Sequence, residues 1–285
     1  MSHQRLVLTL SCPDRRGIVA AVSSFVTASG CNIVEAQQYL DPDTTHFFLR
    51  LAADVEEPRA SLNDLRDAFG TVAEAFSMDW QIWDAAVRPR IMIMVSQHDH
   101  CLADLLSRRR AGTLPVEVVG VVSNHRAAEE LVRWHGVPFH HLPVAAQTRT
   151  DQEQRLLQLV ADENVDLVVL ARYMQILSAD VCKELEGRII NIHHSFLPSF
   201  KGARPYAQAH AHGVKIIGAT AHYVTPDLDE GPIIEQDVAR VDHGCDVDRL
   251  VAVGRDIEAQ VLARAVRWHA ERRVLLNGVR TVVFA

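Results

Sequence analysis

Short apolar runs rich in β-branched residues alternate with helical stretches in the second part of the chain, and this alternation limits the fold more than any other feature. Between the runs, apolar residues recur at helical spacing in residues 102–110, 127–134 and 152–163. Strands that are apolar on both faces are typical of a parallel sheet covered by helices on each side. The pattern therefore predicts an α/β fold with a doubly wound, mostly parallel sheet, whose ligands bind beyond the carboxyl ends of its strands. The four runs are residues 91–95, 116–122, 166–171 and 189–193.

Further elements complete this second region. Residues 215–224 and 232–241 have the pattern of strands, and a long helix is expected over residues 246–272. The pair Asn277-Gly278 suits the two-residue turn of a closing hairpin, because both residues tolerate a positive φ.

The start of the chain follows a different order, β-α-β-β-α-β. Strands are expected over residues 5–11, 32–40, 46–53 and 79–83, with helices over residues 18–28 and after Ser61, a good N-cap. This order predicts a ferredoxin-like fold, a four-stranded antiparallel sheet with two helices on one face. The segment AAVRPR at residues 85–90 separates the two patterns. We therefore expect a first domain over residues 1–84, a linker over 85–89 and a second domain over 90–285.

Composition excludes several classes of protein. The 285 residues carry 29 Lys and Arg against 36 Asp and Glu, a net charge of −7, which disfavours nucleic acid as a partner. No run approaches ~20 apolar residues and the first residues lack an apolar leader, so we expect no membrane partner and a cytoplasmic location. The five cysteines are scattered without a Cys-x-x-Cys pair, which predicts free thiols. The 15 histidines form no recognisable ligand set, so no metal is expected.

Polar residues gather at the end of the strand expected over residues 189–193. Asn191 and His193 are two residues apart, so they point to the same side of the strand. Thr220, His222 and three carboxylates in residues 225–232 follow the next strands. An amide, an imidazole and a carboxylate supply what attack on an acyl or formyl carbon requires: an oxyanion donor, a proton carrier and a group that orients it. From these residues alone, structural histidines at a strand end remain an alternative.

A longer string around these residues resembles a known family. The string is NIHHSFLPSFKGARPYAQAHAHGVKIIGATAHYVTPDLDEGPIIEQ, which begins at Asn191. It resembles the signature of folate-dependent formyl-group enzymes, with Asn-x-His, Ser-x-Leu-Pro, Gly-x-Thr-x-His and a Leu-Asp loop before Gly-Pro-Ile. The resemblance covers residues 90–285 and implies a formyltransferase-like domain. Carried over by position, it implies that Asn191, His193 and Asp229 are catalytic.

The same resemblance implies a folate pocket. The segment LARYMQILS at residues 170–178 is similar to the family's segment that lines the pterin pocket. Folate is then the substrate, and no separate cofactor is implied. The implied pocket residues are Met174, Ile176, Leu177, Thr225, Pro226, Asp227 and Leu228.

Three branches of this family differ in the acceptor of the formyl group. The branch that formylates a ribonucleotide holds its phosphate in a glycine-rich loop, whereas residues 96–101 contain no glycine. The branch that formylates initiator tRNA has a basic C-terminal domain, which this acidic chain lacks. The deformylase branch joins an ACT domain to the formyl-transfer fold and uses water. It implies hydrolysis of 10-formyltetrahydrofolate to formate and tetrahydrofolate for one-carbon and purine metabolism, with His194 and residues 201–206 closing the space for an amine. A formyltransferase with a small amine acceptor and a regulatory protein with a degenerate site remain rival interpretations.

The first region supports the deformylase branch. Residues 12–19, CPDRRGIV, and residues 30–33, GCNI, are similar to ACT domains, which often bind amino acids. This implies an effector site at Asp14, Gly17 and Asn32, where free N–H groups at a helix start favour a carboxylate. The alternative is that Asp14 only caps the helix and the domain assembles subunits. We expect a homo-oligomer, because sheet edges of this kind are commonly covered by another copy.

Overall fold

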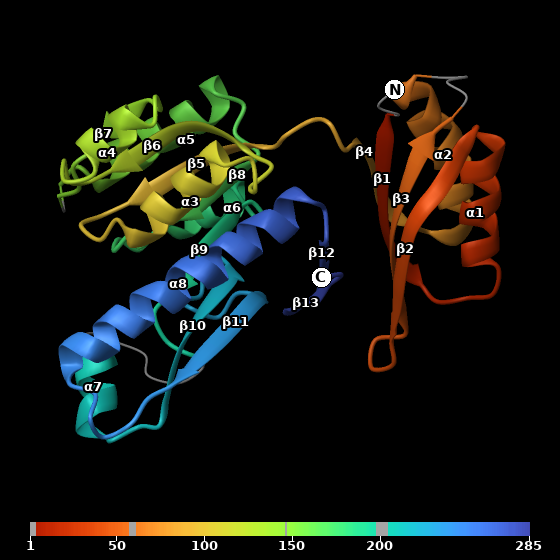
Figure 1. The fold of residues 1–285 in the computed structure, drawn as a ribbon. Helices are drawn as coiled ribbons and strands as arrows, with labels where there is room; N and C mark the ends of the chain where they lie inside the picture. Colours follow the sequence, from red (N-terminus) through yellow and green to blue (C-terminus); the bar gives the residue numbers. More distant parts are fainter. Residues whose placement is uncertain (1–3, 57–60, 146, 198–204) are drawn as a thin grey trace. The chain divides into compact units, whose positions relative to one another are not determined.

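The computed structural model describes residues 4–56, 61–145, 147–197 and 205–285 (Figure 1). Contacts along the chain divide it into two compact units. Unit 1 contains Met1–Arg88 together with Glu271–Asn277 and Thr281–Ala285, and unit 2 contains Pro89–Ala270 and Gly278–Arg280. Most of the C-terminal hairpin thus groups with the first unit, although the sequence pattern places it in the second domain. The domain boundaries drawn from the sequence stay predictions.

Unit 1 has the predicted β-α-β-β-α-β order. Its four strands form one antiparallel sheet in the order β2-β3-β1-β4, which confirms the ferredoxin-like fold. Alternate residues of β1, Leu6, Leu8 and Leu10, enter a core shared with Val22 of α1 and Phe69 of α2. The elements are β1 (Arg5–Pro13), α1 (Ile18–Ala28), β2 (Cys31–Asp41), β3 (His46–Val55), α2 (Leu62–Phe76) and β4 (Asp79–Asp84).

The two helices of unit 1 begin in different ways. Ser61 caps α2 in a capping box, in which its hydroxyl accepts from the backbone of Asp64 and the Asp64 carboxylate accepts from the backbone of Ser61. By contrast, α1 begins at Gly17, which has a φ of 97°, a positive value that glycine adopts without steric strain. No side chain caps this helix. The alternative in which Asp14 caps this helix is therefore wrong.

The opposite face of the unit 1 sheet carries a buried charge. Phe48 and Arg50 point to this face because Leu49 and Leu51 point to the helices. Arg50 donates two hydrogen bonds, of 3.1 and 3.3 Å, to the backbone carbonyl of Glu271 and lies 3.0 Å from the Glu35 carboxylate. The segment from Glu271 through β12 (Val274–Asn277) and β13 (Arg280–Val283) thus supplies polar partners to the sheet.

Unit 2 contains a seven-stranded sheet in the order β11-β10-β9-β8-β5-β6-β7. The run from β7 to β9 is parallel, while β10 pairs antiparallel with both β9 and β11, so the predicted doubly wound, mostly parallel sheet is confirmed. Its strands are β5 (Arg90–Val95), β6 (Glu117–Ser123), β7 (Phe139–His141), β8 (Leu167–Leu170), β9 (Ile189–His193), β10 (Ile216–Tyr223) and β11 (Ile233–Arg240). Its helices are α3 (His100–Arg110), α4 (Glu129–Trp134), α5 (Arg149–Asp162), α6 (Ala179–Glu184), α7 (Pro205–Ala211) and α8 (Val247–Ala270).

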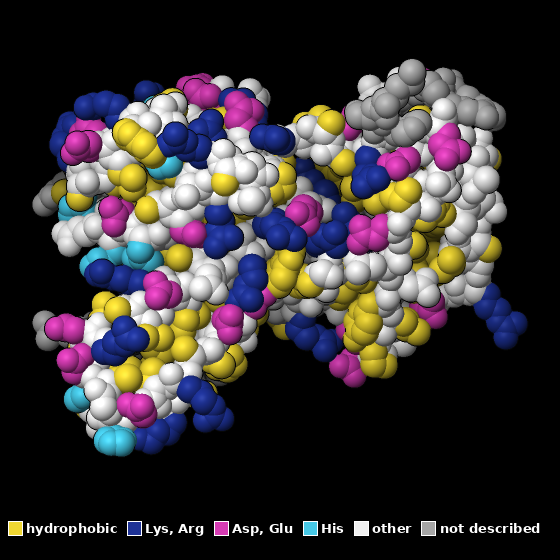
Figure 2. All heavy atoms as spheres, in the orientation of Figure 1, with side chains coloured by type: hydrophobic (Ala, Val, Ile, Leu, Met, Phe, Trp, Pro, Cys, Tyr) yellow, Lys and Arg dark blue, Asp and Glu magenta, His cyan; other side chains and the backbone are white. Residues whose placement is uncertain are grey.

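Three short elements of unit 2 were not predicted: β7, α6 and α7. Each has three to seven residues, too few for a hydrophobic period to be recognised. Over the face drawn in Figure 2, Lys and Arg side chains are interspersed with Asp and Glu. Among the described residues, no helix is long and apolar enough to span a bilayer.

The pairing of β9 with β10 positions the polar residues of unit 2. In this antiparallel ladder His222 stands opposite Asn191, and Thr220 stands opposite His193. Directly opposed side chains lie close together on one face of a sheet. Two residues that are 31 positions apart in the sequence, Asn191 and His222, therefore meet at the end of β9.

Glu35 balances two arginines of unit 1, which gives a test of the packing around Arg50. The Glu35 carboxylate lies 3.0 Å from Arg50 and 3.1 Å from Arg273. Because Glu35 is partly exposed, its loss should cost less than the loss of a partner from a fully buried pair. We expect Glu35→Gln to lower the free energy of unfolding by about 1–2 kcal/mol in chemical denaturation. The control Glu74→Gln, at an exposed position of α2, should change it by less than about 0.5 kcal/mol. Equal stability of the two variants would contradict this role of Glu35.

Candidate active site

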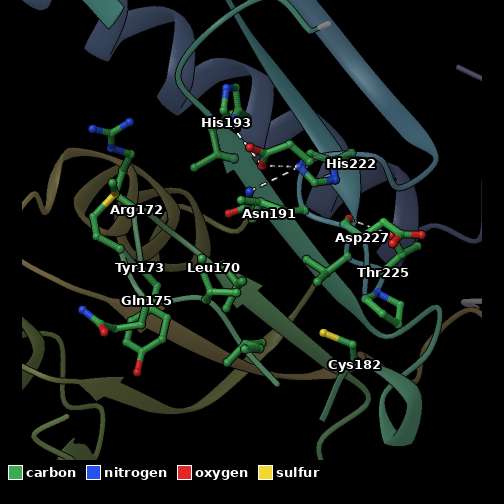
Figure 3. Close-up of a pocket in the computed structure, with 18 of the residues that line it drawn as sticks. Leu170, Arg172, Tyr173, Gln175, Cys182, Asn191, His193, His222, Thr225 and Asp227 are labelled. Atoms are coloured by element: carbon green, nitrogen blue, oxygen red, sulfur yellow. Dashed lines mark hydrogen bonds and ion pairs between the residues drawn. The ribbon is translucent and has the colours of Figure 1, made fainter. Parts of the chain in front are cut away.

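A cavity of about 260 Å³ opens at the carboxyl ends of β8 and β9 (Figure 3). All of the residues expected to be catalytic or to bind folate line it, so residues 174–177 and 225–229 share one cavity, although only the resemblance to the family implied this grouping. Leu170, Arg172, Tyr173, Gln175, Cys182, His194 and His222 complete much of the lining. The expected residues along its wall are Asn191, His193, Asp229, Met174, Ile176, Leu177, Thr225, Pro226, Asp227 and Leu228.

Strand alternation presents Asn191 and His193 to this cavity. Ile190 and Ile192, which alternate with them along β9, are buried, and Ile192 also contributes to the lining of the cavity. Asn191 is half-buried and His193 is buried, and both line the cavity as their spacing in the sequence predicts.

An ion-pair contact joins His193 to Asp229. The Nδ1 atom of His193 lies 3.2 Å from Oδ1 of Asp229, so Nδ1–H donates to the carboxylate. In the neutral imidazole the lone pair then resides on Nε2. This atom is buried and has no hydrogen-bond partner within the described residues. His193 therefore presents a proton-accepting nitrogen whose tautomer is set by Asp229.

The loop that carries Asp229 has an unusual backbone. Asp229 has a φ of 58°, in the left-handed region that aspartate tolerates better than most residues. Two residues later, Gly231 lies against the backbone carbonyl of Tyr223, where a Cβ atom would overlap it. The hydrogen bond from His193 lowers the pKa of the Asp229 carboxyl, against the opposing effect of burial. The loop thus holds an ionised carboxylate at the imidazole.

His222 sets the orientation of the Asn191 amide. The Nδ1–H of His222 donates to the carbonyl of Tyr223 at 2.8 Å, and burial lowers the pKa of His222, which keeps the ring neutral. Its Nε2 therefore accepts, and the amide nitrogen of Asn191 lies 3.3 Å away as the donor. The second N–H of that amide is left to face a ligand. The sequence contains His222 in its Gly-x-Thr-x-His motif, but only the register of β9 and β10 reveals this contact.

Hydrogen bonds from outside the cavity hold the chain between Arg172 and Ser178. The Ser96 hydroxyl accepts from the backbone N–H of Met174 at 2.9 Å, and the buried Glu153 accepts from that of Ser178 at 2.8 Å. Met174 and Ile176 nevertheless leave more than half of their side chains exposed, at 54% and 61%. Apolar side chains that are held open beside a cavity are available to an apolar ligand.

One cluster in unit 2 has residue types that bind metals. Ligand atoms of His100, Cys101 and Glu258 lie within 4.8 Å of one another. The Arg172 guanidinium lies 3.5 Å from the same Glu258 carboxylate, and His100 is hydrogen-bonded to it at 2.7 Å. A neighbouring cation opposes a second positive charge, so this geometry favours an ion-paired cluster over a metal centre.

The residues expected to bind an effector belong to unit 1, whereas this cavity is lined by residues of unit 2. Gly17 begins α1, and Asn32 is exposed on β2 opposite Asp54. A cavity of about 30 Å³ in this unit is lined by core residues such as Leu8, and Asp14, Gly17 and Asn32 are not among them.

Comparisons with known proteins place the chain in a family. The formyl transferase family matches residues 89–266, and the ACT domain family matches residues 6–70. Formyltetrahydrofolate deformylase of Corynebacterium sp. (strain P-1) is 52% identical over 99% of both chains. The enzyme of that name from Bacillus subtilis is 49% identical over 97% of this chain and 93% of its own. The chain belongs to the formyltetrahydrofolate deformylase family.

Solved structures of this family match both units. The crystal structure of formyltetrahydrofolate deformylase from Burkholderia mallei has 51% sequence identity, covers both chains completely and gives a TM-score of 0.95. Glycinamide ribonucleotide transformylase 1 from Symbiobacterium toebii is 34% identical and gives a TM-score of 0.66. That match covers 70% of this chain and 95% of the transformylase chain, which distinguishes it from the full-length match to the deformylase.

The lowered pKa of Asp229 predicts how stability depends on pH. A carboxylate with a depressed pKa stabilises the fold above its unfolded pKa of about 3.9, and this contribution is lost as the pH falls through the lower folded value. In urea denaturation between about pH 5 and pH 2, the parent chain should therefore lose stability more steeply than Asp229→Asn, whose amide keeps the side-chain shape. The control Asp79→Asn, exposed on β4, should follow the parent. Parallel curves for the parent and Asp229→Asn would exclude this effect of the His193 contact.

Proposed function

We propose that the chain hydrolyses 10-formyltetrahydrofolate to formate and tetrahydrofolate, with water as the acceptor. The observation that carries this proposal is the His193–Asp229 pair, which leaves a proton-accepting Nε2 next to an oriented amide of Asn191. Relatives that are about half identical over nearly the whole chain bear the name formyltetrahydrofolate deformylase, which supports the same reaction. The products, formate and free folate, are those that one-carbon and purine metabolism use.

The site residues divide the reaction between them. Nε2 of His193 takes a proton from water as the water oxygen attacks the formyl carbon, and Asp229 stabilises the imidazolium that forms. The free N–H of Asn191 donates to the oxyanion of the tetrahedral intermediate. When the intermediate collapses, the bond from carbon to N10 breaks, and N10 receives the proton that His193 holds. One water is consumed, and one formate and one tetrahydrofolate leave.

Folate is the substrate in this proposal, and the reaction needs no cofactor. The exposed apolar side chains of Met174, Ile176 and Leu228 offer an apolar rim for the pterin. Residues 225–228 line the same cavity, and in this proposal their backbone groups supply the polar recognition of the pterin. The cavity of about 260 Å³ is of the size that holds the ring portion of such a ligand, with the rest of the molecule extending outside.

Two observations favour water over a larger acceptor. Residues 96–101, after β5, contain no glycine and include Asp99, so they suit a substrate phosphate poorly. The net charge of −7 and the mixture of charges in Figure 2 offer no platform for tRNA on the face drawn. The sequence predicts that residues 201–206 close the site, and of these, residues 201–204 lie outside the described residues.

Unit 1 is proposed to assemble subunits and to bind an amino acid. Its strand β2 forms an edge of the sheet, and Tyr39 and Leu40 of that strand are exposed apolar side chains, which supports pairing with a second copy. For the effector, the start of α1 at Gly17 offers backbone N–H groups that are not capped by a side chain, with Asp14 and Asn32 as the neighbouring polar residues.

The role of Asn191 can be measured directly. Asn191→Ala removes the oxyanion donor, so kcat for formate release from 10-formyltetrahydrofolate should fall by about 100–1,000-fold. The control Asn63→Ala, at an exposed position of α2, should keep the parent rate. An Asn191→Ala enzyme within about threefold of the parent would contradict the oxyanion role.

The pocket assignment can be measured by binding. Ile176→Ser removes an exposed apolar side chain from the cavity rim, so the Kd for tetrahydrofolate should rise by about tenfold in a calorimetric titration. Thermal stability should change little, because this side chain is 61% exposed. Val279→Ser, at an exposed position outside the cavity lining, is the matched control and should bind folate as the parent does. Unchanged affinity in Ile176→Ser would remove Ile176 from the folate site.

A further inference from the structure

A buried polar cluster lies directly beside the candidate active site. Glu258 of α8, which is only 1% exposed, accepts hydrogen bonds from the Tyr206 hydroxyl at 2.6 Å and from His100 at 2.7 Å. The guanidinium of Arg172 lies 3.5 Å from the same carboxylate, and its side chain is 11% exposed. Burial is the largest single effect on Glu258 and raises its pKa, but the contacts with His100, Arg172 and Tyr206 together outweigh it, so the pKa is lowered and the carboxylate is ionised. We call these four residues the Glu258 cluster.

The Glu258 cluster fills a place where open α/β sheets usually bind ligands. The chain runs from β5 outward through β6 and β7, and then returns to β8 on the other side of β5. The strand order therefore reverses between β5 and β8, and ligands of such sheets bind in the crevice outside this point. His100 follows β5 and Arg172 follows β8, and the backbone N–H of Ser96 donates to the Arg172 carbonyl across the crevice. Side chains of this protein thus occupy the crevice.

The cluster is continuous with the catalytic residues. Arg172 lines the same cavity as Asn191 and His193, and Figure 3 shows the Arg172 guanidinium and the His193 ring both directed away from Leu170 and Cys182. The ring of His194 stacks on that of His193, with 4.9 Å between centroids and 16° between planes. Burial, together with the charge of Arg172, lowers the pKa of His194 to about 4, so the ring that stacks on His193 is uncharged.

Tyr206 packs too closely on α8 for a molecule to enter between them. Gly254 stands one helical turn before Glu258, and a Cβ atom at this position would overlap the Tyr206 hydroxyl and ring. The absence of a side chain at Gly254 therefore lets the tyrosine reach Glu258. Burial raises the pKa of Tyr206, so the hydroxyl stays protonated and donates.

We propose that the Glu258 cluster, with Tyr206 as its space-filling member, excludes amine acceptors from the crevice and so reserves the formyl carbon for water. This proposal rests on the proposed hydrolysis and names the residues that determine its acceptor. Without the Tyr206 ring, a small primary amine can occupy the crevice. Its nitrogen then attacks the formyl carbon, the bond to N10 breaks, and the proton that the amine loses passes to N10. The products are an N-formyl amine and tetrahydrofolate.

The test is a competition between glycinamide and water. Parent and variant enzymes receive 10-formyltetrahydrofolate with saturating glycinamide, and mass spectrometry measures the ratio of N-formylglycinamide to formate. The parent should form formate almost exclusively. Tyr206→Ala should raise the ratio by at least about tenfold, because it removes the whole ring. The matched control Tyr206→Phe keeps the ring and loses only the hydroxyl, so its ratio should remain near that of the parent.

A second variant keeps the proposal testable if Tyr206→Ala does not fold. Gly254→Ala favours the helix by about 1 kcal/mol and displaces Tyr206 from α8, so it should raise the ratio in the same direction. If Tyr206→Ala and Gly254→Ala both give the parent's ratio of N-formylglycinamide to formate, the proposal is wrong. It is also wrong if Tyr206→Phe raises the ratio as much as Tyr206→Ala, or if the parent itself formylates glycinamide in preference to water. Formate release by the parent is also measured without glycinamide. If the parent releases formate there, the proposed hydrolysis holds and these outcomes test only the exclusion of amines.

Discussion

The hydrogen bond from Nδ1 of His193 to Asp229 determines the chemistry that the site can perform. It fixes the imidazole tautomer, places the lone pair on a buried Nε2 and keeps the carboxylate ionised. The two partners come from β9 and from a loop 36 positions later (229 − 193), so the bond forms only when the antiparallel β9–β10 pair is in register. The left-handed backbone of Asp229 and the close approach at Gly231 bring the loop to the imidazole.

The residues around this pair determine the orientation of the neighbouring groups and the charge near them. A neutral His222 orients Asn191, and a neutral His194 stacks on the ring of His193. The Arg172–Glu258 pair in the crevice between β5 and β8 adds charge beside the site, because Arg172 also lines the cavity. In both proposals water is the molecule that gives a proton to His193. The proposed hydrolysis and the proposed exclusion of amines therefore describe one site.

Periodicity in the sequence predicted most of the fold. Strands with long apolar runs, such as β5, and an amphipathic helix with a Ser61 cap leave clear patterns, so their bounds agree with the structure within a few residues. The strand pair Asn191 and His193 was predictable for the same reason. Glu258 and His100 were not, because each lies on a helix with an ordinary pattern and acquires its meaning only where helices meet. Tyr206 was implied only as part of residues 201–206, and its contact with Glu258 has no local signal. The pairing of Arg50 with Glu271, which are 221 positions apart, likewise has no local signal.

The most direct test of the account is the origin of the oxygen in the formate. The enzyme is incubated with 10-formyltetrahydrofolate alone in ¹⁸O-labelled water, and formate and tetrahydrofolate are measured together by mass spectrometry. Attack of water on the formyl carbon predicts one solvent oxygen in each formate and equal amounts of the two products. Tetrahydrofolate released without formate, or formate without a solvent oxygen, would contradict hydrolysis at the His193–Asp229 pair.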